Sequence, residues 1–332
     1  MGRKLRLQNR IGRSIATLPV VSLLALAVWW LPQGGYSHDY AVSLVLVMLA
    51  AYVIAETNNT NMLIRTRSRM IASVWVFSMA CLTFLHPFSP SILATFCLTA
   101  SFYLLFRTYQ QAEPVVDVFH TFVMLSLGSI FFPWMIYFVP FFLWHLAVFM
   151  RAMTFRTFFA ALVGALLPFW FWSGWLFWNG DLTPLFSWNS EALSVTWIWQ
   201  QEALLSLPLT FPRLAFLVLS VFALWVSVAY MLHSYDDKIR TRMMLYVYVF
   251  QTLLLVVFGF LSFSDDLLLG LLPMLVLCAS PLLAHYFTLT TTWFSLIVFF
   301  LFLFCLLALG LLTLRLEAFN MINFVNHALH VR

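Results

Sequence analysis

Two ionisable side chains three residues apart, Asp117 and His120, are the first that could carry chemistry. On a helix they share one face, where an acid and an imidazole can relay a proton or contact a substrate. They lie just inside an apolar segment, where ionisable groups are costly and usually face a partner. Arg65, Arg107 and Arg151 are the natural partners, so a structural ion pair is the alternative. Two ligands make a poor zinc site, and we expect no metal.

A second polar group ends an earlier apolar segment. It consists of Glu56, Asn58, Asn59, Asn61 and Arg65. Glu56 and Asn59 are spaced i,i+3, and Asn61 and Arg65 are spaced i,i+4, so each pair can share a helix face. Polar residues at the end of a membrane span often mark only the water boundary. The alternative is a substrate-binding site, to which Arg107 at the same depth would contribute.

Seven of the fourteen tryptophans fall close together, just past the middle of the chain. They are Trp170, Trp172, Trp175, Trp178, Trp188, Trp197 and Trp199. Trp prefers a membrane interface because its ring is apolar and its N–H seeks water. Residues 179–212 are therefore predicted to form an outer interfacial segment. It is either a dense aromatic belt or a platform on which Trp188, Trp197 and Trp199 bind an amphiphile.

Asp39 is predicted in the first outer loop. Membrane glycosyltransferases that use polyprenyl-linked sugars employ an acid in that loop as a catalytic base. They also usually carry larger outer loops or a soluble domain, which are not seen here, and most outer-loop acids are simply hydrated. Asp39, Asp117 and His120 are the catalytic candidates. No P-loop, dinucleotide fingerprint, zinc helix or nucleophile elbow occurs, which counts against ATP-driven transport and common hydrolysis. No cofactor is expected.

Composition indicates which elements must position these residues. The chain of 332 residues is 63% hydrophobic and 9% charged, whereas soluble domains are about 25% charged. A chain with this few charged residues could not cover a water-facing surface. Lipid must therefore be its main solvent. The net charge is +5, but the basic residues flank apolar segments and form no patch interleaved with aromatic residues. No nucleic-acid partner is therefore expected.

The predicted fold is all-α: one polytopic transmembrane helix bundle over residues 1–332, with about eleven spans (ten to twelve). The spans run over residues 15–32, 40–56, 70–86, 91–107, 115–132, 134–150, 157–178, 212–232, 243–263, 267–285 and 291–314. Several are short and are expected to be tilted, kinked or buried in the bundle. Residues 115–150 are alternatively one broken re-entrant unit, since Pro133 and Pro140 interrupt them.

Placing the N-terminus in the cytoplasm puts fourteen of the seventeen Lys and Arg residues on the cytoplasmic side, as the positive-inside rule requires. They are Arg3, Lys4, Arg6, Arg10, Arg13, Arg65, Arg67, Arg69, Arg107, Arg151, Arg156, Lys238, Arg240 and Arg242. Arg213, Arg315 and Arg332 are on the far side. If the last two spans formed a re-entrant hairpin, the C-terminus would move to the cytoplasm.

Four stretches in the first half carry a family resemblance. They are Glu56–Arg65, His86–Pro90, Phe106–Gln110 and Asp117–Phe131. Together they resemble an uncharacterised family of multi-pass inner-membrane proteins of Bacteroidota, over roughly residues 50–175. The resemblance implies a bacterial inner-membrane location and no assigned activity. It points to Asn59, Asn61, Arg107 and Asp117, while His120 departs from the small or aromatic residue expected there.

Three functions follow from these residues. The first is handling of an amphiphilic envelope substrate, a lipid or lipid-linked glycan, which predicts a laterally open cavity reaching the Trp-rich segment. The second is a non-catalytic subunit or scaffold of an envelope complex, with other envelope proteins as partners. The third is an ion-coupled transporter that uses Asp117 and His120 and places Asp117 near mid-depth. Membrane lipids are the common partner.

Overall fold

The computed structural model describes residues 6–30, 38–66, 68–193, 210–262 and 264–330, and these residues form helices and links without a β-strand. The α-helices are α1 (Leu7–Arg13), α2 (Thr17–Trp30), α3 (His38–Asn61), α4 (Met70–Cys81), α5 (Pro90–Arg107), α6 (Val115–Phe131), α7 (Phe138–Val148), α8 (Phe155–Trp178), α9 (Thr183–Leu193), α10 (Phe211–His233), α11 (Ile239–Ser262), α12 (Asp265–Leu289) and α13 (Trp293–His330). Short 3-10 turns are η1 (Thr83–Leu85), η2 (Pro133–Tyr137) and η5 (Ser234–Asp236). The predicted all-α class is confirmed.

Seven of the described helices are long and apolar enough to cross a membrane: α3, α5, α8, α10, α11, α12 and α13. An eighth span results if α1 and α2, which meet at an angle of 90°, cross together. The helices α4 and α6, and η2 with α7, are apolar but shorter. Each of the eleven predicted apolar segments is helical over most of its length.

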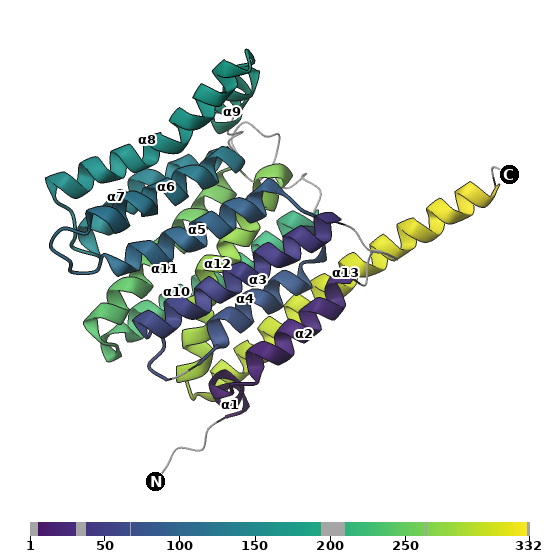
Figure 1. Cartoon of the computed structure of the whole chain (residues 1–332). Coiled ribbons are helices and arrows are strands. Elements are labelled where there is room, and N and C mark those ends of the chain that lie inside the picture. The colour runs from purple at the N-terminus through teal and green to yellow at the C-terminus, as the bar shows by residue number, and fades with distance from the viewer. Residues whose placement is uncertain (1–5, 31–37, 67, 194–209, 263, 331–332) are drawn as a thin grey trace, which may run out of the picture.

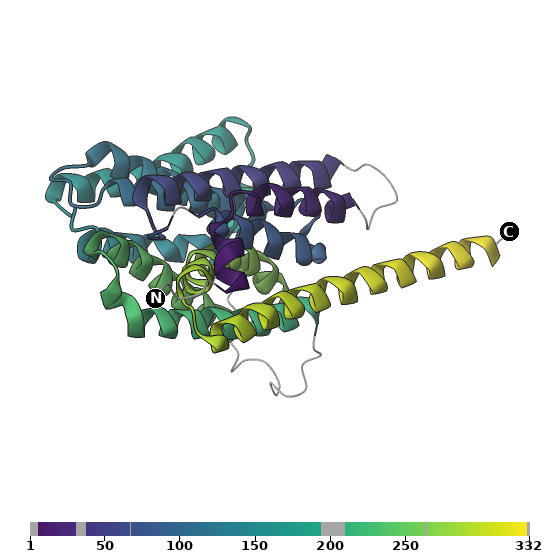
Figure 2. The same ribbon diagram turned by 90° about the horizontal axis from the view of Figure 1, so that it is seen from below.

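The helices run roughly side by side, with α8 along one edge, α2 and α13 along the other, and α12 in the middle (Figure 1). The C-terminal part of α13 projects beyond the other helices in both Figure 1 and Figure 2. Most residues of α12 are buried, including Pro273 and Pro281 within it. A helix that is apolar on all faces belongs in the centre of a bundle, which is where α12 lies.

The peripheral helix α8 packs on α6 through small residues. Ala160, Ala161 and Gly164 are buried on its inner face, and such residues let two helix backbones approach closely in a membrane. A Cβ atom on Gly164 would lie only 2.5 Å from the backbone oxygen of Phe119. The outer face of α8 exposes large apolar side chains such as Trp170, which is 76% exposed. That face therefore suits contact with lipid.

The first helix, α1, is a polar wedge against the end of α12. Gln8 and Asn9 are fully buried. Asn9 Nδ2 lies 3.2, 2.9 and 3.1 Å from the carbonyl oxygens of Phe287, Thr288 and Thr290. Gln8 Nε2 donates to the Thr290 oxygen at 2.8 Å. Carbonyls at a helix end lack partners within the helix, and α1 supplies them. The sequence indicates only a basic stretch here, so this contact was not predicted.

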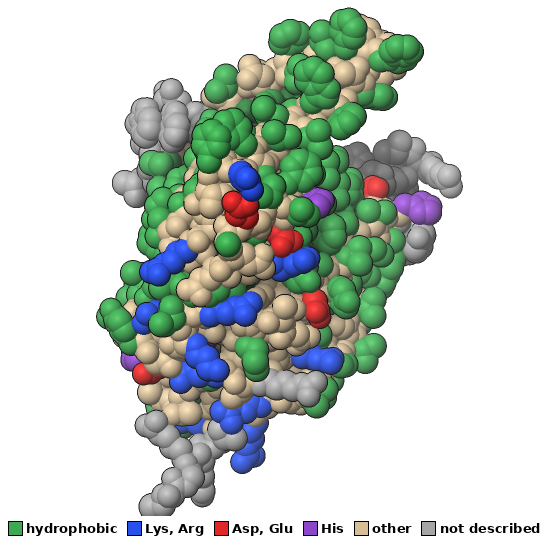
Figure 3. All heavy atoms as spheres, turned by 60° about the vertical axis from the view of Figure 1, so that its left-hand side comes forward, with side chains coloured by type: hydrophobic (Ala, Val, Ile, Leu, Met, Phe, Trp, Pro, Cys, Tyr) green, Lys and Arg blue, Asp and Glu red, His purple; other side chains and the backbone are tan. Residues whose placement is uncertain are grey.

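Several links between helices, including those after α3, α5 and α7, meet at one basic end of the bundle. Gln110 N donates to Met150 O at 2.9 Å, which joins the links after α5 and α7. Arg240 Nη2 donates to Asn61 Oδ1 at 2.9 Å, which joins the start of α11 to the end of α3. Figure 3 shows the basic side chains gathered on this face, beside broad hydrophobic surface. The predicted clustering of Lys and Arg thus has a structural counterpart.

Candidate functional site

Asp237 is the centre of a buried cluster at the basic end. It lies between η5 and α11, and its side chain has no exposed surface. Arg65 Nε donates to its Oδ1 at 2.7 Å, and His285 Nε2 lies 2.9 Å from its Oδ2. A buried carboxylate is costly unless it is paired. Here both oxygens have a partner, and these come from the link after α3 and from the end of α12.

The carboxylate of Asp237 stays ionised in this cluster. Burial raises its pKa, but the hydrogen bond and charge of His285, followed by those of Arg65, lower the pKa more, so it lies below its ordinary value.

Arg65 reaches Asp237 because the chain turns sharply after α3. Met62 has a φ of +51°, a left-handed conformation that ends the helix. Asn58 holds the turn from inside: its Nδ2 donates to Ser68 O at 2.8 Å, and its Oδ1 accepts from Ile64 N at 3.3 Å. Asn58 belongs to the predicted polar group. Its structural role is to hold the loop that carries Arg65, and this depends on Ser68 returning beside it, which the sequence does not show.

The polar group predicted at the end of α3 divides in the structure. Asn61 and Arg65 both contact residues around the start of α11, through Arg240 and Asp237. Asn59 is exposed. Glu56 accepts a hydrogen bond from a neighbour one turn along, the Thr60 hydroxyl, at 3.2 Å. Three of the five predicted residues, Asn58, Asn61 and Arg65, therefore make buried or partly buried contacts with other parts of the chain.

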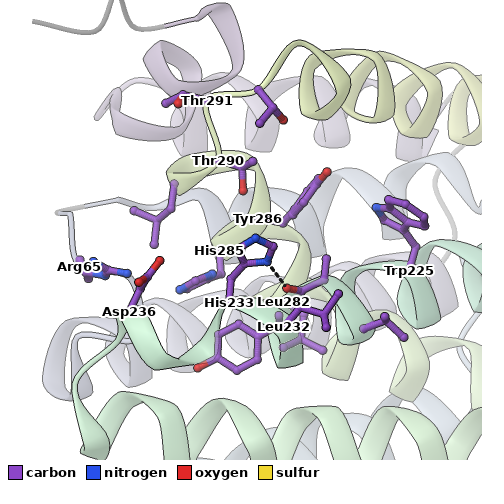
Figure 4. A pocket seen from close by; sticks show the side chains of 15 residues that line it. Arg65, Trp225, Leu232, His233, Asp236, Leu282, His285, Tyr286, Thr290 and Thr291 are labelled. Atoms are coloured by element: carbon purple, nitrogen blue, oxygen red, sulfur yellow. Dashed lines mark hydrogen bonds between the residues drawn. The ribbon is translucent and has the colours of Figure 1, made fainter.

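A pocket of about 570 Å³ lies beside this cluster. Arg65 and Asp236 lie at one end of it and Trp225 at the other, with His233 and His285 between them (Figure 4). The lining also includes Val228, Leu232, Leu282, Leu289 and Thr290–Thr292. The pocket is thus polar at one end and apolar along its wall, and its volume is in the range of small-molecule sites.

Asp117 pairs with Arg107, one of the three partners that the sequence offers. Arg107 Nη2 lies 3.4 Å from Asp117 Oδ1. Asp117 is in the first turn of α6, whereas the transporter hypothesis predicts it near mid-depth. His120 is exposed, and its ring contacts that of Phe119. The pair Asp117 and Arg107 therefore has the character of an ion pair at the end of a span, with His120 outside it.

The outer candidates lie at the opposite end of the bundle. Asp39 is exposed in the first turn of α3. Trp188 donates from Nε1 to Ser129 O at 2.7 Å, and its ring packs on Phe169 with centroids 4.8 Å apart. Trp188 therefore fixes α9 to the end of α6 and α8. Trp197 and Trp199 lie outside the described residues.

No protein-family model, curated protein or solved structure matches this chain. The resemblance to the Bacteroidota family stays an expectation, and the argument for function rests on geometry alone. In the part of the chain that the structure describes, no group of three or more His, Cys, Asp and Glu side chains is placed to hold a metal ion.

Sequence reasoning did not place Asp237 or His285 in a functional site. The available signal was a pair of acids, Asp236 and Asp237, directly before the basic residues of the same link. In the sequence such a pair looks like an ordinary hydrated loop. Only the fold brings it beside Arg65 and His285.

Proposed function

We propose that the chain crosses a bacterial inner membrane eleven times with its basic end in the cytoplasm. Eleven helical segments are apolar, although three are short, and the basic links gather at one end. Short helices packed inside a bundle can cross where the bilayer is locally thinned. Among the short helices, α4 is almost entirely buried in the bundle, and α6 begins with the ion pair between Asp117 and Arg107. Both features are consistent with short spans inside the bundle.

Two introduced cysteines test this orientation. Asn59 is exposed at the basic end, and Ser187 is exposed on α9 at the opposite end. A membrane-impermeant maleimide applied to intact spheroplasts should label Ser187→Cys and leave Asn59→Cys unlabelled until the membrane is opened. The native cysteines Cys81, Cys97 and Cys278 are buried and give little background. Labelling of Asn59→Cys in intact spheroplasts would overturn the orientation.

We infer that the protein handles an amphiphile, a lipid or lipid-linked compound, which it binds in the pocket at the basic end. The observation that carries this is the division of the pocket: Arg65 and Asp236 at one end, Trp225 at the other, and aliphatic side chains such as Val228 and Leu232 along the wall. Such a division matches a molecule with a polar head and an apolar chain, because each part meets surroundings like itself.

The wall of the pocket is open toward the lipid. Val228 and Leu232 of α10 line the pocket, yet they are 57% and 72% exposed on the surface of the molecule. In a membrane that surface faces acyl chains, so a bound amphiphile enters sideways from the bilayer. The sequence places the amphiphile at the Trp-rich outer segment instead; the pocket argues for the opposite leaflet.

Photo-crosslinking tests the proposal. Purified protein in nanodiscs should be labelled saturably on α10, around Val228, by a lipid whose acyl chain carries a diazirine. Val228→Trp fills the pocket and should abolish saturable labelling. Val221→Trp is the matched control, since Val221 is 66% exposed on the same helix and does not line the pocket. Labelling that never saturates, in wild type and both variants alike, would show ordinary surface lipid and remove the proposal.

A further inference from the structure

We propose that the head group taken by this pocket is a phosphate, with Arg65 as its main donor. This assignment rests on the proposed function, because it names the chemistry of the same site. Three features support it: the free N–H donors of Arg65, the pairing of Asp237 with Arg65 and His285, and the helix that starts at the rim of the pocket.

Arg65 has donors to spare. A guanidinium carries five N–H groups, and the one on Nε is used by Asp237. The four on the two Nη atoms make no hydrogen bond with the described residues, and the side chain is 47% exposed where it lines the pocket. Paired Nη donors match two oxygens of one phosphate, which is why Arg is favoured at phosphate sites.

Asp237 holds this donor without competing for the ligand. Its carboxylate is fully buried, and its two oxygens face Arg65 and His285. Asp237 is not part of the pocket lining, so its negative charge lies behind these two lining side chains while it keeps the guanidinium in one orientation. A donor that is already fixed loses less entropy when it binds. Asp236 is the acid of the lining, and it is exposed to water, which screens its repulsion of an anion.

The start of α13 adds to the attraction. Thr290–Thr292 line the pocket directly before this helix, and Thr292 Oγ1 accepts from Ser295 N at 3.2 Å as a cap. The free N–H groups of a helix N-terminus favour an anion. The opposing carbonyls at the end of α12, including Thr290 O, are already bonded to Gln8 and Asn9. The hydroxyl of Thr291 is a further donor in the lining of the pocket.

The test compares head groups on one acyl chain. Diazirine-labelled phosphatidic acid, which ends in a phosphate monoester, and the matching phosphatidylcholine are titrated into nanodiscs that contain the full-length protein. We expect phosphatidic acid to label α10 at the lower concentration. Arg65→Gln should weaken this labelling about ten- to hundred-fold, the effect of losing charge-assisted hydrogen bonds. Arg65→Lys, which keeps the charge and loses the paired geometry, should lie between.

Three controls keep the result interpretable. Arg69→Gln removes an exposed cation of the same loop outside the pocket and should change nothing. Thr291→Val removes a pocket hydroxyl without touching Asp237, and should weaken labelling a few-fold even if Arg65→Gln folds poorly. Glycerol 3-phosphate and inorganic phosphate are added as competitors, and both should displace phosphatidic acid only at far higher concentration.

The outcomes separate the two proposals. Equal saturable labelling by both lipids, unaffected by Arg65→Gln and by Thr291→Val, would overturn the phosphate assignment and leave the amphiphile site standing. Saturable labelling by neither lipid would remove the amphiphile site itself. If glycerol 3-phosphate competes as strongly as phosphatidic acid, the phosphate assignment stands and the acyl chain contributes nothing, which contradicts the proposed function.

Discussion

Arg65 Nε lies 2.7 Å from Oδ1 of Asp237, although 172 residues separate them in the chain. His285 occupies the second oxygen of the same carboxylate. One buried charge therefore joins the link after α3, the link before α11 and the end of α12. Such a junction fixes the basic end of the bundle whatever the pocket binds.

The cluster should contribute measurably to stability. Asp237→Ala leaves Arg65 and His285 without their shared acceptor, and we expect a loss of about 2–3 kcal/mol, as for hydrogen bonds to charged groups. Glu113→Ala is the matched control, because Glu113 and Arg156 pair at 2.8 Å with side chains 50% and 74% exposed. An exposed pair is worth about 0–1 kcal/mol. Equal shifts in the midpoint of SDS-induced unfolding would contradict the assignment.

The same carboxylate predicts how stability depends on pH. The pKa of Asp237 is lower in the folded protein than its ordinary value, so the unfolded chain takes up a proton first as pH falls. The stabilisation by Asp237 is therefore present above about pH 4, the ordinary pKa of Asp, and is lost as the pH falls through the folded pKa. Unfolding midpoints of wild type and Asp237→Asn should differ at pH 7 and converge in strong acid. A constant difference down to pH 3 would disprove this.

Substitution by alanine should affect stability differently at two glycines of α8. Gly164→Ala would place a methyl group 2.5 Å from the backbone oxygen of Phe119, so α8 must move away from α6, and we expect a loss of about 1–3 kcal/mol. Gly174 has nothing within 4 Å of the equivalent position, so Gly174→Ala should stay within about 1 kcal/mol of wild type. SDS unfolding of the two variants checks the prediction, and similar behaviour would argue against close packing of α8 on α6.

The wedge formed by α1 can be loosened by one substitution. Asn9→Ala removes the amide that lies against three carbonyls at the end of α12. Losing these bonds should cost about 1–2 kcal/mol and raise the open population of α1 by roughly five- to thirty-fold. Limited trypsin cleavage at Arg10 and Arg13 should accelerate by the same factor as the open population. The control variant Asn59→Ala, changed at an exposed position, should be cleaved at the wild-type rate. Unchanged cleavage in Asn9→Ala would show that α1 is held otherwise.

The sequence predicted the helices well because each apolar segment is long and its ends are marked by polar or basic residues. The span around residue 120 illustrates this: the segment predicted at 115–132 is the helix Val115–Phe131, and its acid Asp117 contacts an arginine at the same depth. Both features are local, within one helix or between neighbouring ones, and local patterns can be read from spacing.

The buried cluster could not be predicted in the same way. Asp237 and His285 stand in parts of the sequence that no periodicity connects with Arg65. Their meeting depends on the order in which α3, α10 and α12 pack, which one sequence does not reveal. Asn59 shows the converse case, since the sequence groups it with Asn61 and Arg65, whereas in the structure it is exposed and apart from their contacts with Arg240 and Asp237.

The position of α1 has a consequence for biogenesis. Its buried amides Gln8 and Asn9 bind carbonyls of residues 287–290, from which they are separated by 278 to 282 residues. Synthesis runs from the N-terminus, so α1 leaves the ribosome well before those carbonyls are made. The helix α1 therefore has to wait for α12 before it can dock, and its polar side chains stay without these partners until then.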